Sequence, residues 1–442
     1  MTIEARAIAD KGNTMNNRAT SSLVGGFAAL VLMLFSAMSL FVSFFALFLG
    51  PVSRDLSWSL VTFPQGMLTY SIAYSLVAPF SGRLSDQVSA LLAFVLGCLC
   101  TAAGLVSLSF MTGSTWQLVG SATLLGLGGT LVGPPTLARR VSMYFEKRRG
   151  VAMGIIFGAG PMLAAGALSP LISSTVAELG WRTTYRGMAV ACVVASLLMV
   201  LVLKLVPPGE DASGEEDCKM APGLGVRAAV GQRTFWIILA VSILMTCSFG
   251  GVTSHLVAIA TESGQSAAFG ATLMSAAFLS GVAGPVLSGL LADWLNGPKA
   301  FLPFLGAALI GYAMLSFQVE GAAMMAAAGL IGIGFSAWSG QTALLITRYF
   351  GLRAPGAIDA LVFASGSIFL GLGPVLLGVL HRSQGNYHFA LNLCLGFLVI
   401  AFALVSLLGP FASFQQLSAQ ASNEAEDGAS RGDEAEMMSA SR

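Results

Sequence analysis

Long apolar stretches separated by short polar connections fill most of this chain. Twelve of them approach or exceed the roughly 20 residues that an α-helix needs to cross the hydrocarbon core of a bilayer. They lie at 23–49, 59–80, 90–111, 117–141, 151–177, 185–206, 234–258, 268–291, 300–318, 322–347, 356–380 and 389–411. The pattern predicts an all-α membrane protein with twelve transmembrane helices.

One connection is longer and more polar than the others, and it divides the twelve stretches into two sets of six. It covers 207–233 and contains an acidic run from Glu210 to Asp217. The predicted parts are a cytoplasmic N-terminal segment (1–22), an N-terminal six-helix half (23–206), a cytoplasmic central linker (207–233), a C-terminal six-helix half (234–411) and a disordered cytoplasmic tail (412–442).

The composition agrees with a membrane protein and limits its partners. Hydrophobic residues make up 55% of the 442 positions and charged residues only 10%, against about 25% charged in typical soluble domains. The net charge of +1 gives no reason to expect nucleic acid. The six cysteines and three histidines have no metal-ligand or redox spacing, and no nucleotide-binding loop is present. We expect no enzymatic activity, cofactor or metal, and no required oligomer.

The distribution of Lys and Arg sets the predicted orientation. With both chain ends in the cytoplasm, 18 of the 22 basic residues fall on the cytoplasmic side. Only Arg54, Arg182, Arg186 and Arg382 remain outside. Cytoplasmic loops carry an excess of basic residues, so this asymmetry indicates an even number of crossings with both termini inside. The short loops and the absence of an Asn-X-Ser/Thr sequon favour a bacterial inner membrane.

A short motif occurs twice, about 207 residues apart. The first copy is Gly82-Arg83-Leu84-Ser85-Asp86, and the second is Gly289-Leu290-Leu291-Ala292-Asp293. Glycine lets neighbouring helix ends approach closely because it has no Cβ. A carboxylate at the start of a helix accepts backbone N–H groups and meets the positive end of the helix dipole. We therefore expect Asp86 and Asp293 to cap the third and ninth helices.

Two further sequence motifs repeat in the same order. They are Tyr144-Phe145 with Arg148 and Gly150, matched by Tyr349-Phe350 with Arg353 and Gly356, and Gly158-Ala159-Gly160-Pro161, matched by Gly371-Leu372-Gly373-Pro374. Together with the first motif, these repeated motifs indicate a duplicated six-helix unit, as in transporters built from two parallel repeats.

The duplicated motif, placed between membrane-length segments, resembles a loop motif of the major facilitator superfamily. The resemblance implies a secondary transporter that exposes a site between its halves to each side in turn. It also implies a conformational latch formed by Gly82, Arg83, Asp86, Gly289 and Asp293. Leu290 stands where the first copy has Arg83, so the second latch is expected to be weaker or absent.

Several loop phrases resemble one branch of that superfamily, the monocarboxylate transporters and oxalate/formate antiporters. They are Tyr144 to Gly154, Ser57-Trp58-Ser59, Gly180-Trp181-Arg182 and Ser254-His255-Leu256-Val257. The branch implies transport of a small monocarboxylate, coupled to protons. It commonly has an arginine in helix 8, whereas Ala271 to Leu291 here contain no charge. Two alternatives therefore stay open: proton-driven efflux of an apolar compound or drug, and a non-transporting sensor with the same fold.

Polar or aromatic side chains inside the predicted helices are candidates for a substrate site, because in lipid such groups must face protein or water. The candidates are Ser39, Ser43, Tyr70, Tyr74, His255, Trp338, Gln341 and Arg139. The serines share one face of helix 1 with Ser36, and the tyrosines lie one turn apart on helix 2. These residue types also suit ordinary helix packing, so both roles remain open.

Two of these candidates carry or acquire charge. His255 is the only histidine inside a predicted helix, and an imidazole can change charge near neutral pH and couple protons to transport. A hydrogen-bonded packing histidine is the alternative. Arg139 ends predicted helix 4, where it either attracts an anion to the cytoplasmic mouth or serves as a topology marker or ion-pair partner.

Overall fold

The fold was analysed in a computed structural model. It describes residues 23–87, 90–133, 137, 141, 152–205, 223–295, 297–351 and 353–411, without the side chains of 38, 79–91, 203 and 340. The described chain is built from helices, joined by turns and short loops. An isolated β-bridge pairs Gly223 with Gly351.

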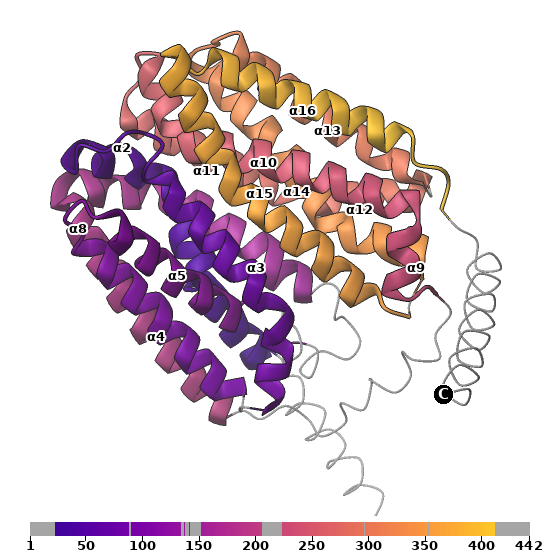
Figure 1. Cartoon of the computed structure of the whole chain (residues 1–442), viewed down its shortest axis with the longest axis horizontal. Helices are drawn as coiled ribbons and strands as arrows, with labels where there is room; N and C mark the ends of the chain where they lie inside the picture. The colour runs from indigo at the N-terminus through magenta and orange to yellow at the C-terminus, as the bar shows by residue number, and fades with distance from the viewer. Residues whose placement is uncertain are drawn as a thin grey trace, which may run out of the picture.

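The helices form two groups that follow the chain order. The first comprises an apolar helix at Leu23–Leu34, η1 (Met38–Val42), α2 (Phe45–Asp55), α3 (Pro64–Gln87), α4 (Ala90–Ser109), α5 (Thr115–Leu131), η2 (Gly154–Ala159) and α8 (Gly160–Leu205). The second comprises α9 (Val226–Gly231), α10 (Arg233–Glu262), α11 (Ala267–Gly281), α12 (Ala283–Leu295), η4 (Pro298–Phe301), α13 (Leu302–Ser316), α14 (Gly321–Phe350), α15 (Pro355–Gln384) and α16 (His388–Ser406). Figure 1 shows the two groups side by side, indigo to magenta and pink to yellow.

These elements correspond in order to the twelve predicted crossings. Eight segments of the described chain are long and apolar enough to cross a membrane, and the one at Gly154–Val202 is 49 residues long. It contains two crossings, because Gly180 (φ 78°) interrupts the helical backbone of α8. Glycine adopts this left-handed region without the steric cost of a Cβ. The remaining crossings are supplied by the divided first helix, by α3 and by the 17-residue α5.

The first crossing differs from the continuous helix predicted at 23–49. Turns at 35–36 and 43–44 interrupt it, and the π-helix η1 lies between them. The Ser39 hydroxyl donates to a backbone carbonyl six residues earlier at 2.8 Å, and the Ser39 N–H donates to Ser36 Oγ at 3.4 Å. Such side-chain bonds compete with the regular helical ladder. Ser39 and Ser43 therefore do not lie on one continuous α-helix, on which their predicted shared face depended.

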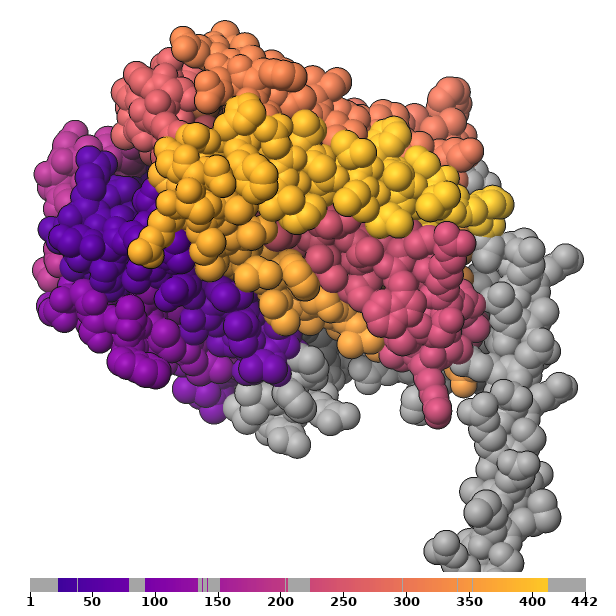
Figure 2. Space-filling view, turned by 45° about the horizontal axis from the view of Figure 1, so that its top comes forward, coloured from indigo at the N-terminus to yellow at the C-terminus, as the bar shows by residue number. Residues whose placement is uncertain are grey.

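The two halves contact each other through symmetric helix pairs, α3 with α15 and α8 with α11. A Cβ on Gly371 of α15 would lie 2.5 Å from Ser71 Oγ, and one on Gly166 of α8 would lie 2.6 Å from Leu279 Cγ. In each pair, the second helix of one half meets the fifth helix of the other, as a duplicated six-helix unit would produce. Figure 2 shows α15 lying directly against the indigo residues of the N-terminal half.

The predicted linker is partly folded. Its first part, like the predicted segments 1–22 and 412–442, lies outside the described residues. From Gly223 onward the chain packs on the C-terminal half: Leu224 is buried, and its N–H donates to the Phe350 carbonyl at 2.8 Å. The short helix α9 follows directly. The end of the linker is thus attached to the end of α14.

Candidate functional site

Tyr70 and Tyr74 lie on α3 at the boundary between the halves. Both are buried, with 4% and 2% of their surface exposed, and their ring centroids are 6.1 Å apart. The Tyr74 ring also lies 6.1 Å from Phe363, which belongs to α15 of the other half. Beside it, the Ser75 hydroxyl donates across the boundary to the Ala364 carbonyl at 2.9 Å. Among the described candidates, Tyr74 has a ring contact with the other half, whereas the ring of Tyr70 contacts Phe41 and Tyr74 within its own half.

Two glycines at the end of α5 make room for these phenol groups. A Cβ on Gly129 would lie 2.9 Å from the Tyr70 hydroxyl oxygen, and one on Gly133 would lie 3.2 Å from the Tyr74 hydroxyl oxygen. The glycines are four residues apart, as are the tyrosines, so the two segments match turn by turn. The glycines were not predicted as site residues. Their matched spacing is visible in the sequence, but their proximity to the tyrosines is not.

The Tyr74 hydroxyl is buried and has no hydrogen-bond partner among the described residues. Leaving a buried hydroxyl unsatisfied costs roughly 1–3 kcal/mol. Native structures rarely retain such a group without a reason. A phenol can both donate and accept, so this hydroxyl has hydrogen-bonding capacity that the described residues do not use.

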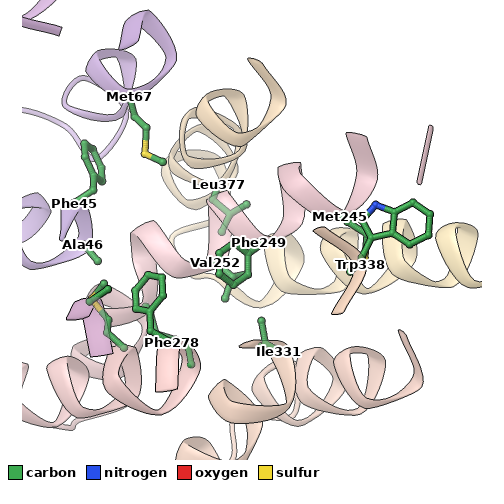
Figure 3. Packing of buried hydrophobic residues seen from close by; sticks show 14 of the residues in the cluster. Phe45, Ala46, Met67, Met245, Phe249, Val252, Phe278, Ile331, Trp338 and Leu377 are labelled. Atoms are coloured by element: carbon green, nitrogen blue, oxygen red, sulfur yellow. The ribbon is translucent and has the colours of Figure 1, made fainter. Parts of the chain in front are cut away.

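Trp338 is a packing residue inside the C-terminal half rather than part of the boundary. It is buried, and its Nε1–H donates to Ser242 Oγ of α10 at 3.0 Å. Its ring packs edge-on against Phe301, at a centroid distance of 6.2 Å. Figure 3 shows it beside Met245. Its indole N–H is thus already used within the half, and a substrate contact by Trp338 stays a prediction.

Gln341 joins α14 to α12 and touches the duplicated motif. Its Nε2 donates to the Pro285 carbonyl at 2.8 Å, and a Cβ on Gly289 would lie 3.0 Å from the same nitrogen. The sequence suggested a substrate contact for Gln341 and a latch for Gly289. In the structure the two residues form one contact, in which the missing Cβ leaves space for the amide.

His255 is fully buried, and both of its ring nitrogens are hydrogen-bonded. Nε2 lies 2.9 Å from the Pro374 carbonyl, and Nδ1 lies 2.8 Å from the Tyr387 hydroxyl. A carbonyl only accepts, so Nε2 carries the proton and Nδ1 accepts from Tyr387. This geometry matches the packing alternative. His255 is also not the only helical histidine, since His381 lies in α15 and His388 begins α16.

The duplicated aspartates do not cap the helices that follow them. Asp86 lies in the last turn of α3, and Asp293 lies in the last turn of α12. Both helices run beyond their predicted ends, to Gln87 and Leu295. The Asp293 carboxylate is therefore near the negative end of a helix dipole instead of the positive one. Asp293 is exposed. The surroundings of Gly82, the side chains of Arg83 and Asp86, and all of Arg139 lie outside the described residues.

The middle of the described helices carries no formal charge. Every described Asp, Glu, Lys and Arg lies near a helix end or near the kink at Gly180. The polar groups around Tyr74 are hydroxyls and backbone carbonyls, and the surrounding surface is aromatic. The described contacts of Tyr74 are therefore with uncharged groups, and the ionisable Asp359 lies one turn before Phe363 on α15.

Two of the loop phrases have a clear structural role at one end of the N-terminal half. Trp58 Nε1–H donates to the Gly113 carbonyl at 3.2 Å, and Arg182 donates to the Met111 carbonyl at 3.1 Å. Arg182 also forms an ion pair with Asp55. These bonds fix the loop at 110–114. The loop at 385–387 lies at the same end of the molecule as this loop. We call this end the loop end.

The profile of the Major Facilitator Superfamily matches residues 29–358. The chain belongs to the major facilitator superfamily. This membership identifies it as a multi-pass membrane transporter by family rather than an enzyme.

Named relatives and solved structures support the assignment. Monocarboxylate transporter 13 of Bos taurus is 28% identical over 363 residues, which cover 78% of each chain. Monocarboxylate transporter 12 of Rattus norvegicus is 30% identical over 155 residues, covering 33% of this chain and 32% of its own. The fold resembles the nucleoside transporter NupG (D323A mutant), with a TM-score of 0.69 and 11% identity over 87% of this chain and all of the other. It also resembles a bacterial homolog of the human lysosomal transporter Spinster, with a TM-score of 0.66 and 15% identity over 88% of this chain and 96% of the other.

Proposed function

We propose that this protein is a secondary active transporter that moves a small monocarboxylate together with protons by alternating access. We infer a monocarboxylate substrate from the sequence similarity to monocarboxylate transporter 13, which extends over 78% of both chains. The position of Tyr74 between the halves supports a binding site there, since transporters with this architecture bind substrate near the midplane at the repeat interface.

In this proposal the Tyr74 hydroxyl donates a hydrogen bond to a carboxyl oxygen of the substrate. Tyr70 and the aromatic rings around it contact the apolar part of the substrate. The glycines opposite the two phenols keep the space next to these hydroxyls free of side chains. Rocking of the halves about the α3–α15 and α8–α11 contacts then exposes the same hydroxyl to each side of the membrane in turn.

The uncharged middle of the described helices supports proton coupling. A carboxylate moved into an apolar region without a partner carries a desolvation cost of several kcal/mol or more. A proton carried on the substrate removes that charge, so the acid crosses in its neutral form. Arg139, outside the described residues, is proposed to attract the anion at the cytoplasmic mouth before it takes up the proton.

The orientation, the domain boundaries and the latch are parts of the same proposal. Both termini face the cytoplasm of a bacterial cell, and the loop end faces outward, as the excess of basic residues on the opposite side indicates. The six-helix halves occupy 23–206 and 234–411. The motif residues Gly82, Arg83, Asp86, Gly289 and Asp293 act at the cytoplasmic end to hold one facing state, with Gln341 supporting Gly289.

A second candidate function is proton-driven efflux of an apolar compound. The aromatic, charge-free surroundings of Tyr74 favour it, because such a surface suits an uncharged ligand as well as a neutral acid. A non-transporting sensor with the same fold is the third candidate, and it predicts ligand binding without flux.

Uptake into proteoliposomes under an imposed pH gradient tests these functions against one another. The panel consists of radiolabelled aliphatic and aromatic monocarboxylates and one dicarboxylate. Saturable monocarboxylate uptake that a protonophore abolishes is the expected result. If folded, reconstituted protein takes up none of these acids but expels a fluorescent apolar dye, the efflux function replaces the proposal. If it binds ligands without moving them, the sensor function does.

A further inference from the structure

A cluster of ionisable side chains lies at the loop end of the C-terminal half, apart from the tyrosine pair. His381 Nε2 of α15 lies 3.0 Å from Glu262 Oε2 at the end of α10. The other carboxylate oxygen, Oε1, accepts the Tyr387 backbone N–H at 3.4 Å. The Tyr387 ring lies 4.3 Å from the His381 ring, centroid to centroid, and its hydroxyl donates to His255. Three segments, α10, α15 and the loop before α16, therefore meet at this cluster.

The groups of the cluster differ in their access to water. The side chains of His381 and Glu262 are 23% and 36% exposed, so both are accessible to the adjoining solution. His255 is fully buried behind Tyr387, and both of its ring nitrogens are hydrogen-bonded. Burial, with the nearby Glu262 carboxylate, raises the pKa of Tyr387, which keeps its hydroxyl protonated as the donor to His255. The histidine of the cluster that solution can reach is thus His381.

The cluster lies directly behind the surface that touches the N-terminal half. Ser254, next to His255 in the chain, donates from its hydroxyl to the Met67 sulfur of α3 at 3.5 Å. One turn before His381, a Cβ on Gly378 would lie 2.4 Å from the Leu60 carbonyl oxygen. The two helices that the cluster joins are therefore the helices that close the loop end against the other half.

We propose that Glu262, His381 and Tyr387 form a proton-binding site that fastens α10 to α15 and favours closure of the loop end when His381 is protonated. A proton from the solution binds the imidazole, and the neutral hydrogen bond to the Glu262 carboxylate becomes an ion pair. His255 also faces the site from α10, and Arg382 follows His381 on α15. Through the orientation proposed above, the proton comes from outside the cell. The inference is otherwise independent of what is transported.

The test measures opening of the loop end directly and requires no substrate. Spin labels are placed at Trp116→Cys and Phe317→Cys, two exposed positions at the loop end of opposite halves. The distribution of distances between the two labels is recorded by double electron–electron resonance in lipid nanodiscs between pH 5 and 8. Protein without these two substitutions is labelled in the same way and gives the background signal. We expect the ratio of open to closed populations to rise with pH by up to about fivefold, the upper range for a partly exposed ion pair.

Three variants make the result specific. His381→Gln keeps a hydrogen-bonding side chain but cannot be protonated, so it should show the high-pH distribution at every pH. Glu262→Gln removes the same ion pair from the other partner and should do likewise, which preserves the test if one variant fails to fold. His388→Gln is the matched control, because His388 bonds to Asn392 outside the cluster and its loss should leave the response intact.

Three outcomes would overturn the inference: no pH response in the labelled protein, a full response in a folded His381→Gln variant, or loss of the response in His388→Gln. Because the readout is a distance, a protein that moves no monocarboxylate but opens with rising pH would contradict the proposed function alone.

Discussion

Replacement of Tyr74 by phenylalanine separates a substrate-binding role from a packing role. The substitution removes only the hydroxyl, which is buried and without a partner among the described residues. The ring contacts with Tyr70 and Phe363 remain. An unsatisfied buried hydroxyl costs roughly 1–3 kcal/mol, so its removal should leave the free energy of unfolding unchanged or raise it. A variant that is as stable as the parent yet binds substrate less tightly is the expected outcome.

The size of the transport defect indicates which form of the substrate Tyr74 contacts. A hydrogen bond to a neutral acid contributes about 0.5–1.5 kcal/mol, and one to a carboxylate about 1.5–3 kcal/mol. At about 1.4 kcal/mol per tenfold change, KM should rise about 2- to 12-fold in the first case and roughly 12- to 140-fold in the second. The proposed passage of a neutral acid predicts the smaller change.

The assay pairs proteoliposome uptake with thermal unfolding of the same preparations. Tyr185→Phe is the matched control: its hydroxyl is also buried and unpartnered in the described structure, but its ring stacks on Phe48 inside the N-terminal half, 4.0 Å away between centroids. The control should keep the parent KM. If Tyr74→Phe also keeps the parent KM, the hydroxyl does not contact the substrate. If it unfolds more readily than the parent, the hydroxyl has a partner and the argument from an unsatisfied donor is wrong.

Two further substitutions test the boundary and the buried histidine. Gly371→Ala puts a Cβ about 2.7 Å from the Met67 carbonyl oxygen, so it should hinder approach of the halves and lower the uptake rate. The control Gly396→Ala, whose Cβ meets no neighbour within 4 Å, should leave the rate unchanged. Equal rates for the two variants would show that the halves do not need this close contact. His255→Ala leaves the Pro374 carbonyl without its donor and should lower unfolding stability by about 1–3 kcal/mol while proton-coupled uptake persists. Loss of coupling at unchanged stability would instead identify His255 as a proton carrier.

The apolar pattern predicted the crossings well because the bilayer itself imposes it. In hydrocarbon, backbone groups must be satisfied within the segment, so a run of about 20 apolar residues has few alternatives to a helix. The pattern failed where side chains compete for the backbone. Ser39 bonds to a carbonyl six residues earlier and helps to divide the first crossing, although its neighbours are as apolar as those of any other helix.

The candidate site was harder to predict because a polar side chain in a helix does not reveal its partner. Tyr74 and Trp338 both looked like ligand contacts, but the indole N–H donates to Ser242 inside one half, whereas the Tyr74 ring contacts Phe363 of the other half and its hydroxyl has no partner among the described residues. The opposing Gly133 and the pairing of Glu262 with His381 are equally tertiary features. Only the position of helices relative to one another distinguishes these cases.

The contact that closes the halves and the proposed substrate contact lie on the same helix pair, which has a mechanistic consequence. A ligand shifts a conformational equilibrium only by the difference in its affinity for the two states. Tyr74 of α3 faces Phe363 of α15, and within one turn of it Ser71 abuts Gly371 of the same opposite helix. If the substrate binds at Tyr74 as proposed and fits the open and closed arrangements of α3 and α15 differently, its binding energy acts directly on the contact that must open and close. No separate relay between site and gate is then needed.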